Sequence, residues 1–267
     1  MEILGYLASF LMGITLGLIG GGGSILTVPI MVYLFGYSPL MATGNSLLVV
    51  GLTALVGSIM YARKGEVDFK TGFSFAVPSI LGVNLSRGLI IPQIPDLIFS
   101  YNGFVLSKEI LIMVVFAALM ITASYSMIKK KNSMITMNAS PMMRIALMAI
   151  LGLMVGLIAG FVGAGGGFLI IPVLVLFAGL SMRFAVGTSL MIIALQSLFG
   201  FAGDISRGIK FEWSLLGTVA TIAILGIIIG SAFTHKIKEQ KLKTAFGWFV
   251  LLMGTTILIE QLRHISF

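Results

Sequence analysis

The sequence predicts an all-α polytopic membrane protein with two inverted internal repeats of about five helical elements each and broken or re-entrant glycine-rich segments. Three observations lead to this fold class. The chain is 58% hydrophobic and only 10% charged, whereas a soluble domain has about 25% charged residues. Residues 3–62 contain no charged residue, and at about 20 apolar residues per crossing they can span a bilayer about three times. The third observation is a glycine-rich motif that occurs twice.

The repeated motif reads GLIGGGGSILTVP at residues 17–29 and GFVGAGGGFLIIP at residues 160–172, at an offset of 143 positions. Glycine weakens a helix and proline removes a backbone donor, so each copy should interrupt a helix. In a bilayer the freed backbone groups must be buried in protein or line a watery cavity. One interruption in each half therefore points to a transporter binding site. The alternative is that these glycines only let helices pack closely.

Ten apolar segments follow one another along the chain, five in each half. In the first half they are residues 3–19, 24–36, 39–62, 71–91 and 103–128. In the second half they are residues 145–162, 168–179, 184–203, 211–234 and 242–262. The second segment of each half is too short to cross a bilayer alone and is expected to be re-entrant or a half-helix. We therefore expect a first membrane repeat (1–131), a cytoplasmic connector (132–143) and a second membrane repeat (144–267).

An odd number of segments per half predicts that the two repeats are inverted relative to each other. Basic residues concentrate in cytoplasmic loops. With both termini outside the cell membrane, the inverted arrangement puts 12 of the 17 basic residues inside, and a parallel arrangement reaches 10 at best. The positive-inside rule thus favours inversion. The basic residues left outside are Arg87, Lys108, Arg207, Lys210 and Arg263.

The sequence lacks the residue patterns of an enzyme. It contains no cysteine, which excludes disulfides and thiolate metal sites, and it has no HExxH, GxSxG or P-loop lysine motif. Ser24 could suggest an intramembrane nucleophile, but neither histidine is expected at membrane depth to act as its base. We expect no catalytic residue, metal or cofactor. The net charge of +8 comes from loops that set orientation, so no nucleic-acid partner is expected.

The candidate substrate site consists of backbone and neutral polar groups, because no acidic or basic residue is predicted near the midplane. A helix N-terminus carries about half a positive charge and free N–H groups. Two broken segments would aim such ends at the centre and hold an anion without a cation. An anion leaving a cell gains about 2.3 kcal/mol per charge per 100 mV, so export needs no coupling ion. The candidates are Gly20, Gly21, Gly22, Gly23, Ser24, Thr27, Asn45, Ser46, Gly163, Gly165, Gly166, Gly167, Thr188, Ser189 and Gln196.

Three of the polar residues have two interpretations each. Asn45 and Gln196 must face the bundle interior, because burying an unpaired amide in hydrocarbon costs several kcal/mol. There they either bond neighbouring helices or contact substrate. Arg87, near the outer end of its helix, either attracts an anion at the exit or serves as an interfacial anchor.

The two motifs, each followed by a short linker and by ATGNS or AVGTS, resemble the TauE/SafE family of sulfite exporters, and the resemblance covers nearly the whole chain. It implies a multi-pass protein that exports or imports small sulfur-containing or organic anions, such as sulfite, sulfoacetate or related sulfonates. The chain departs from the pattern at Thr188, where the first copy has Asn45, and at Arg87, where a small residue is expected.

These observations predict a membrane transporter that carries a small anion, a sulfur oxyanion or organosulfonate, through a central site between two repeats. The alternatives are a passive anion channel, an intramembrane enzyme and an assembly subunit. Its expected partners are the small anionic substrate and the lipid bilayer. The identity of the substrate, the direction of flux, a coupling ion and a homo-oligomeric state stay open.

Overall fold

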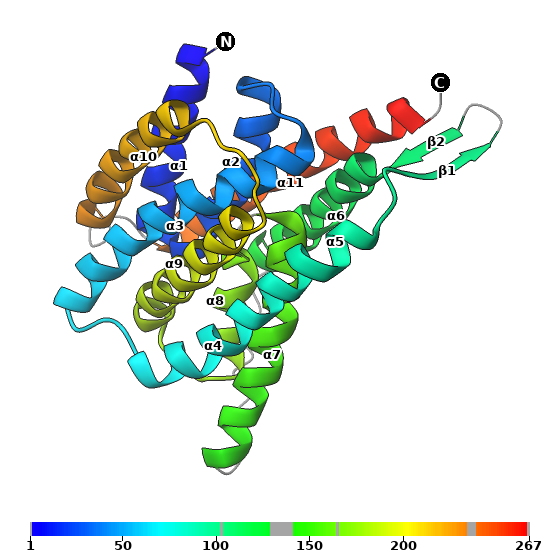
Figure 1. The fold of residues 1–267 in the computed structure, drawn as a ribbon. Coiled ribbons are helices and arrows are strands. Elements are labelled where there is room, and N and C mark those ends of the chain that lie inside the picture. The colour runs from blue at the N-terminus through cyan, green and yellow to red at the C-terminus, as the bar shows by residue number, and fades with distance from the viewer. Residues whose placement is uncertain (1, 102–103, 129–140, 164–165, 234–238, 266–267) are drawn as a thin grey trace.

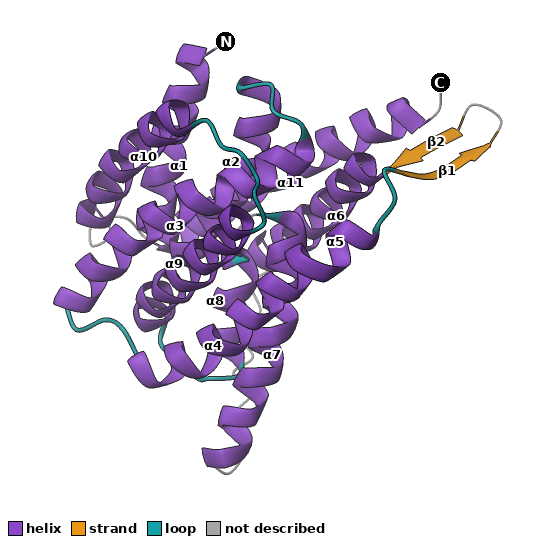
Figure 2. Ribbon diagram, viewed as in Figure 1, coloured by secondary structure: helices purple, strands orange, loops and turns teal. Residues whose placement is uncertain are grey.

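The computed structural model describes residues 2–101, 104–128, 141–163, 166–233 and 239–265, which form a bundle of helices with one small hairpin (Figures 1 and 2). Seven of the described helices are long and apolar enough to cross a membrane. This confirms the all-helical, polytopic prediction. The seven spans are Glu2–Ile19, Pro39–Arg63, Phe69–Gln93, Lys108–Tyr125, Ile145–Val162, Met182–Ser206 and Trp213–Phe233.

The elements of the first half follow the predicted segments closely. They are α1 (Glu2–Ile19), the 3₁₀ helix η1 (Gly20–Leu26), α2 (Thr27–Pro29), the π-helical turn η2 (Ile30–Leu34), α3 (Pro39–Arg63), α4 (Phe69–Leu85), the π-helical turn η3 (Ser86–Ile90), α5 (Ile91–Gln93), β1 (Leu97–Tyr101), β2 (Phe104–Ser107) and α6 (Lys108–Ile128). Side-chain caps fix two of the helix starts, as short polar residues do at an N-cap. Ser38 accepts a hydrogen bond from the Met41 amide, and Asp68 accepts one from the Thr71 amide at 3.0 Å.

The second half contains α7 (Pro141–Val162), α8 (Gly167–Leu176), α9 (Met182–Ser206), α10 (Trp213–Phe233) and α11 (Glu239–Ile265). Residues 132–140 of the predicted connector lie outside the described residues, and its last three residues begin α7. The connector and the division into repeats at these boundaries stay predictions.

The first glycine run ends α1 and turns the chain back along it. Gly20 has φ +71°, a left-handed value that glycine adopts without strain. After the turn, the backbone at Gly23 lies directly against Leu16, and the Phe35 ring packs edge-on against Tyr6 with the ring centroids 5.4 Å apart. Residues 20–35 therefore form a hairpin with α1. The second run breaks the helix in the same way, since Gly163 has φ +75° and α8 begins only at Gly167.

The two halves interdigitate, so that helices of one half pack against helices of the other (Figure 1). The largest helix contacts pair α4 with α7, α1 with α10, α6 with α11, and α3 with α9. At the repeat offset α4 corresponds to α10 and α7 to α1, so the α4–α7 pair and the α1–α10 pair are equivalent. The left-handed glycines also match at this offset, as Gly20 with Gly163, Gly36 with Gly179, and Gly65 with Gly208. The duplication is thus visible in the backbone, while the inverted orientation of the repeats stays a prediction.

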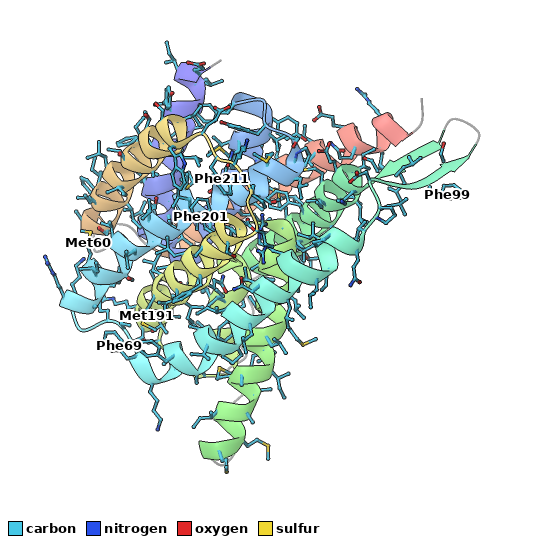
Figure 3. The ribbon with its side chains drawn as sticks, in the orientation of Figure 1. Met60, Phe69, Phe99, Met191, Phe201 and Phe211 are labelled. Atoms are coloured by element: carbon cyan, nitrogen blue, oxygen red, sulfur yellow. The ribbon has the colours of Figure 1, made fainter. Side chains whose placement is uncertain are left out.

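One stretch of the predicted helix at residues 103–128 is instead a strand. Strands β1 and β2 pair antiparallel, with Phe99 opposite Leu106, and this hairpin extends beyond the helices in Figure 1. Phe99, labelled in Figure 3, is about half exposed. The helix begins only at Lys108, because Ser107 accepts a hydrogen bond from the Ile110 amide at 3.3 Å and so caps the first turn.

Candidate functional site

The two glycine-rich interruptions meet in the middle of the bundle. The backbones of Gly21 and Gly167 touch, so a β-carbon at either position would collide with the other. Gly20 lies against Val186 of α9, and Gly163 lies against Thr43 of α3. Both interruptions are therefore real breaks, and they cross between α3 and α9, which are the two most buried spans. Gly22 lies within η1, and Gly165 lies outside the described residues.

Two of the three predicted serines bond backbone carbonyls of the breaks. Ser46 on α3 donates a hydrogen bond to the Gly163 carbonyl in the other half. Ser24 donates to the Gly21 carbonyl at 2.7 Å, and Ser189 donates to Val186 at 2.8 Å. A buried carbonyl without a partner is costly, so the Ser24 and Ser46 hydroxyls stabilise the breaks directly, whereas the hydrogen bond of Ser189 lies within α9.

The predicted amides behave differently from each other. Gln196, with its side chain beside Gly166, accepts a hydrogen bond from the Ser79 hydroxyl of α4, so it bonds a neighbouring helix. Asn45 is 1% exposed, and neither its amide nitrogen nor its oxygen has a hydrogen-bond partner within the described parts of the chain. The buried Thr27 hydroxyl also lacks a described partner. Thr188, which occupies the position of Asn45 in the second repeat, accepts from the Asp68 amide at 2.9 Å.

A buried ion pair joins the two halves close to the breaks. The Arg87 side chain of η3 is 3% exposed and the Asp204 side chain of α9 is 1% exposed, and Arg87 Nε donates to Asp204 Oδ2 at 2.7 Å. Arg87 also donates through Nη1 to the Gly160 carbonyl at 3.1 Å and to the Thr43 hydroxyl at 3.3 Å. Arg87 is therefore not an interfacial anchor. Both members of this pair are buried within the bundle near the ends of their helices, and the expected absence of charges near the midplane stays a prediction.

Sequence reasoning missed Asp204 because the predicted segment ended at residue 203. The helix continues to Ser206, which keeps Asp204 inside the bundle. A signal was available in the spacing, since Ser197, Gly200 and Asp204 repeat at three and four residues and so share one helix face. All three are buried.

A cavity of about 330 Å³ opens beside this ion pair. A β-carbon on Gly44, in its wall, would lie 3.1 Å from Arg87 Nη2 and 3.4 Å from Asp204 Oδ2. Among the predicted site residues, Arg87 lines the cavity, and the described glycines of the two breaks do not. The lining residues are Leu40, Met41, Gly44, Arg87, Ile91, Pro92, Lys108, Asp204, Arg207, Ile209 and Phe211.

The cavity wall carries three basic side chains and one carboxylate. Arg207 Nη2 lies 2.8 Å from Asp204 Oδ1, so Asp204 pairs with two arginines. Lys108 Nζ lies 2.8 Å from Asp96, whose side chain is 97% exposed and is not part of the lining. The lining therefore has an excess of positive charge. A second cavity, of about 290 Å³ between α1, η2 and α11, has mostly apolar walls with Glu260 and no basic residue in its described lining.

The repeat offset relates the cavity beside Arg87 to a face in the other half that carries different side chains. Asp204 corresponds to Tyr61, whose hydroxyl donates to the Gly17 carbonyl at 2.9 Å, the counterpart of the Gly160 carbonyl that Arg87 bonds. Gly187, the counterpart of Gly44, lies directly against the Glu66 carbonyl. One loop thus closes onto α9, whereas the corresponding loop at residues 207–211 leaves room for the cavity.

Comparisons with known proteins agree with this architecture. The family model for sulfite exporter TauE/SafE matches residues 5–257. The probable membrane transporter protein YdhB of Bacillus subtilis is 28% identical over 94% of this chain and 98% of its own length. Probable membrane transporter proteins of Xylella fastidiosa and Methanocaldococcus jannaschii are 28% and 24% identical over 93% and 95% of this chain, covering 91% and 94% of their own lengths. No solved structure matches significantly.

The match of the family model over nearly the whole chain, the long apolar helices and the names of these relatives agree with one another. The chain is a multi-pass membrane transporter and belongs to the sulfite exporter TauE/SafE family.

Proposed function

We propose that this transporter carries a small anion and that the cavity beside Arg87 is its outer binding chamber. The observation that carries the proposal is the charge of the lining, where Arg87, Lys108 and Arg207 face a single carboxylate, Asp204. A cleft lined mainly by one sign of charge, with apolar walls, concentrates ions of the opposite sign. The anion site predicted from the sequence thus gains three cations that the positive-inside count assigns to the outer side of the membrane.

The three cations differ in how easily they can accept a new partner. Arg87 is held by Asp204, Gly160 and Thr43 and is almost fully buried, so it is suited to a fixed positive wall. Arg207 is 30% exposed, and the carboxylate that Lys108 binds is 97% exposed. Lys108 itself is 12% exposed, and an ion pair with a solvent-exposed carboxylate contributes little to stability. A substrate anion can therefore displace Asp96 from Lys108 at low cost.

The glycine breaks supply the route beyond the chamber. The chamber wall includes Gly44 and Arg87, and Arg87 bonds Thr43 and Gly160 next to the crossing of the two breaks. Asn45 and Thr27 carry buried polar atoms without described partners and are suited to contact an anion that passes between the breaks. We infer that Gly20–Gly23, Gly163 and Gly166–Gly167 form the central gate. Ser24 and Ser46 bond its carbonyls, and Ser189 packs against Gly20.

We also propose an orientation of the protein from its repeats. In Figure 1, α1 runs inward from the top of the view and α7 from the bottom, and the two meet at the breaks, which supports inverted repeats. The positive-inside count then puts Arg87, Lys108 and Arg207 on the outer side of the cell membrane. An anion released there from the cytoplasm moves down the membrane potential by about 2.3 kcal/mol per charge per 100 mV, so net export is the favoured direction.

The family description supports a sulfur oxyanion or organosulfonate as the substrate. The test is flux into proteoliposomes with sulfite, sulfate, thiosulfate, sulfoacetate, taurine and simple carboxylates. We expect saturable uptake of at least one anion and faster uptake when the same anion is loaded on the opposite side. Linear, non-saturating flux would support a passive channel instead.

A matched pair of variants locates the chamber. Arg207→Gln should raise the KM for the transported anion about tenfold, because a charge-assisted hydrogen bond to a partly exposed site is worth about 1.5 kcal/mol. Lys210→Gln removes the same charge from the same loop, but Lys210 is not a lining residue. It should leave the KM unchanged. Equal effects of both variants would mean that only general surface charge matters.

A further inference from the structure

The second cavity, between α1, the stretch η1–η2 and α11, is separate from the chamber beside Arg87. Its volume is about 290 Å³, and all of its lining residues are apolar except Tyr33, Thr256 and Glu260. Two of the apolar lining residues, Leu11 and Phe249, are 52% and 46% exposed, so the cavity opens on the outer surface of the bundle. In a membrane-spanning chain, an exposed apolar surface of this kind faces lipid.

The walls of this cavity change from apolar to polar in one direction. On α11 the lining begins at Phe249 and ends at Glu260, and on η1–η2 it begins at Leu26 and includes Tyr33. The negative charge of Glu260 acts on the Tyr33 hydroxyl, so the two polar ends meet. The end of α11 that carries Glu260 lies on the same side of the bundle as the start of α1 (Figure 1).

The length of the cavity matches one leaflet of a bilayer. Phe249 and Glu260 are eleven residues apart on one helix, which corresponds to about 16 Å along its axis. The hydrocarbon core of a bilayer is about 30 Å thick, so one leaflet contributes about 15 Å. A single acyl chain can therefore lie along the cavity with its head group beside Glu260.

Glu260, at the polar end, has no cationic partner in the part of the chain that the structure describes. It is half-buried, and none of the ion pairs between described side chains includes it. Arg263, one turn further along α11, is exposed instead. A carboxylate that is partly removed from water at the edge of a membrane is costly unless a positive charge faces it. The cavity therefore suits a ligand with a cation at one end and an apolar body.

We propose that this cavity binds a phospholipid whose head group carries a primary ammonium, as in phosphatidylethanolamine. One acyl chain lies along Leu11, Phe249 and Met253, and the ammonium donates a hydrogen bond to the Glu260 carboxylate. A charge-assisted hydrogen bond is stronger than a neutral one. A choline head group has no N–H to donate, and the carboxylate repels an anionic head group. Because α11 packs mainly against α6, the lipid fills the space between α11 and the hairpin that α1 forms with residues 20–35.

The choice between head groups tests the role of Glu260. Phosphatidylethanolamine, phosphatidylcholine and phosphatidylglycerol with identical acyl chains are titrated into the full-length protein in detergent, and bound lipid is counted by native mass spectrometry. Phosphatidylethanolamine should bind about tenfold more tightly than the other two, which is the difference that one charge-assisted hydrogen bond makes. Glu260→Gln should abolish this preference. Glu109→Gln, which removes an exposed carboxylate outside the lining, should keep it.

A second pair of variants tests the apolar part of the cavity. Leu11→Trp adds bulk at a lining residue, and Leu7→Trp makes the same change one turn earlier on α1, outside the lining. Leu7 and Leu11 are 55% and 52% exposed, so the fold should tolerate both changes. Leu11→Trp should weaken the binding of all three lipids several-fold, whereas Leu7→Trp should leave it unchanged.

Three results would overturn the proposal. The first is equal affinity of the wild type for the three lipids, and the second is a preference for phosphatidylethanolamine that survives in Glu260→Gln. The third is a dimer that holds no lipid and dissociates in Leu11→Trp, because a second copy of the chain would then cover the cavity. Anion flux in proteoliposomes is a separate measurement, so each of these results leaves the proposed transport function standing.

Discussion

Arg87 donates a hydrogen bond to the Gly160 carbonyl, 3.1 Å away, at the point where α7 approaches its break. The last carbonyls of a helix have no partner within the helix, and here they are buried. In the first repeat, the corresponding carbonyl, that of Gly17, accepts from the neutral hydroxyl of Tyr61 at 2.9 Å. The same backbone requirement is thus met by a charged donor on one face and a neutral one on the other. The charged donor in turn requires Asp204.

Removal of one member of the Arg87–Asp204 pair should destabilise the protein strongly. Arg87→Met leaves the Asp204 carboxylate with Arg207 as its one described ionic partner, and Asp204→Leu leaves the buried guanidinium unpaired. Breaking a buried pair costs about 3–5 kcal/mol, whereas replacing both partners with apolar residues can be neutral. Thermal unfolding in detergent should therefore show large losses for each single variant and a large recovery for the double variant.

The double variant also separates stability from function. Although it should regain the melting temperature, it should not transport anions, because the fixed cation of the chamber wall is gone. Transport at the wild-type rate in the stable double variant would remove Arg87 from the proposed site.

Valine at the crossing of the breaks should stop transport. Gly21→Val and Gly167→Val each place a side chain where two backbones touch, so the breaks must separate. Gly217→Val, on α10, is the control, since a β-carbon there meets no described atom within 4 Å. Flux in proteoliposomes, normalised to the amount of inserted protein, should be lost in the first two variants and retained in the third.

Asn45 and Gln196 should respond in opposite ways to substitution by leucine. Gln196→Leu removes the acceptor of the Ser79 hydroxyl, and a buried group left unsatisfied costs about 1–3 kcal/mol. Asn45→Leu removes an amide that has no described hydrogen-bond partner, so the melting temperature should stay the same or rise. If Asn45 contacts substrate, flux falls in this stable variant; unchanged flux would leave Asn45 without a role in transport.

Alkaline pH should weaken one contact at the edge of the bundle. Tyr37 donates to Glu212 at 2.7 Å, and burial, followed by the hydrogen bond to Glu212 and its negative charge, raises the pKa of Tyr37 from 10 to about 12. The folded state holds this proton more tightly than the unfolded state. The contribution of Tyr37 to the free energy of unfolding is therefore fully present below pH 10 and is lost between pH 10 and about 12. The melting temperature should fall less steeply across this range in Tyr37→Phe than in the wild type.

The absence of cysteine from the sequence allows a direct test of orientation. Lys210→Cys and Lys70→Cys each introduce one thiol at an exposed position. With inverted repeats and external termini, a membrane-impermeant maleimide added to intact cells should label the first variant and not the second. In permeabilised cells the maleimide should label both variants. Labelling of Lys70→Cys in intact cells would reject the proposed orientation.

Local composition was enough to locate most helices, because residence in a bilayer demands a long uncharged run and little else. The breaks at Gly20 and Gly163 were also predictable, since glycine conformational freedom is a local property. The hairpin of β1 and β2 was not predictable in this way. It occupies residues that the sequence assigned to a helix, because α6 begins only after the cap that Ser107 provides.

The charged part of the site could not be predicted from local patterns. Arg87 and Asp204 are 117 positions apart, and only the packing of η3 against α9 shows that each is the partner of the other. A lone charge near the end of an apolar segment is usually assigned to the membrane surface. The extra helical turn that buries Asp204 reverses that assignment.

The pairing of α1 with α10, and of α4 with α7, has a consequence for the history of the chain. Each of these helices finds its main packing surface in the other half, so neither half encloses an interior by itself. A single ancestral unit would have exposed the faces that now meet at Gly21 and Gly167, and it could have hidden them only by associating with a second copy of itself. Within one chain the two faces need not match, and Arg87 and Asp204 occupy only one of them.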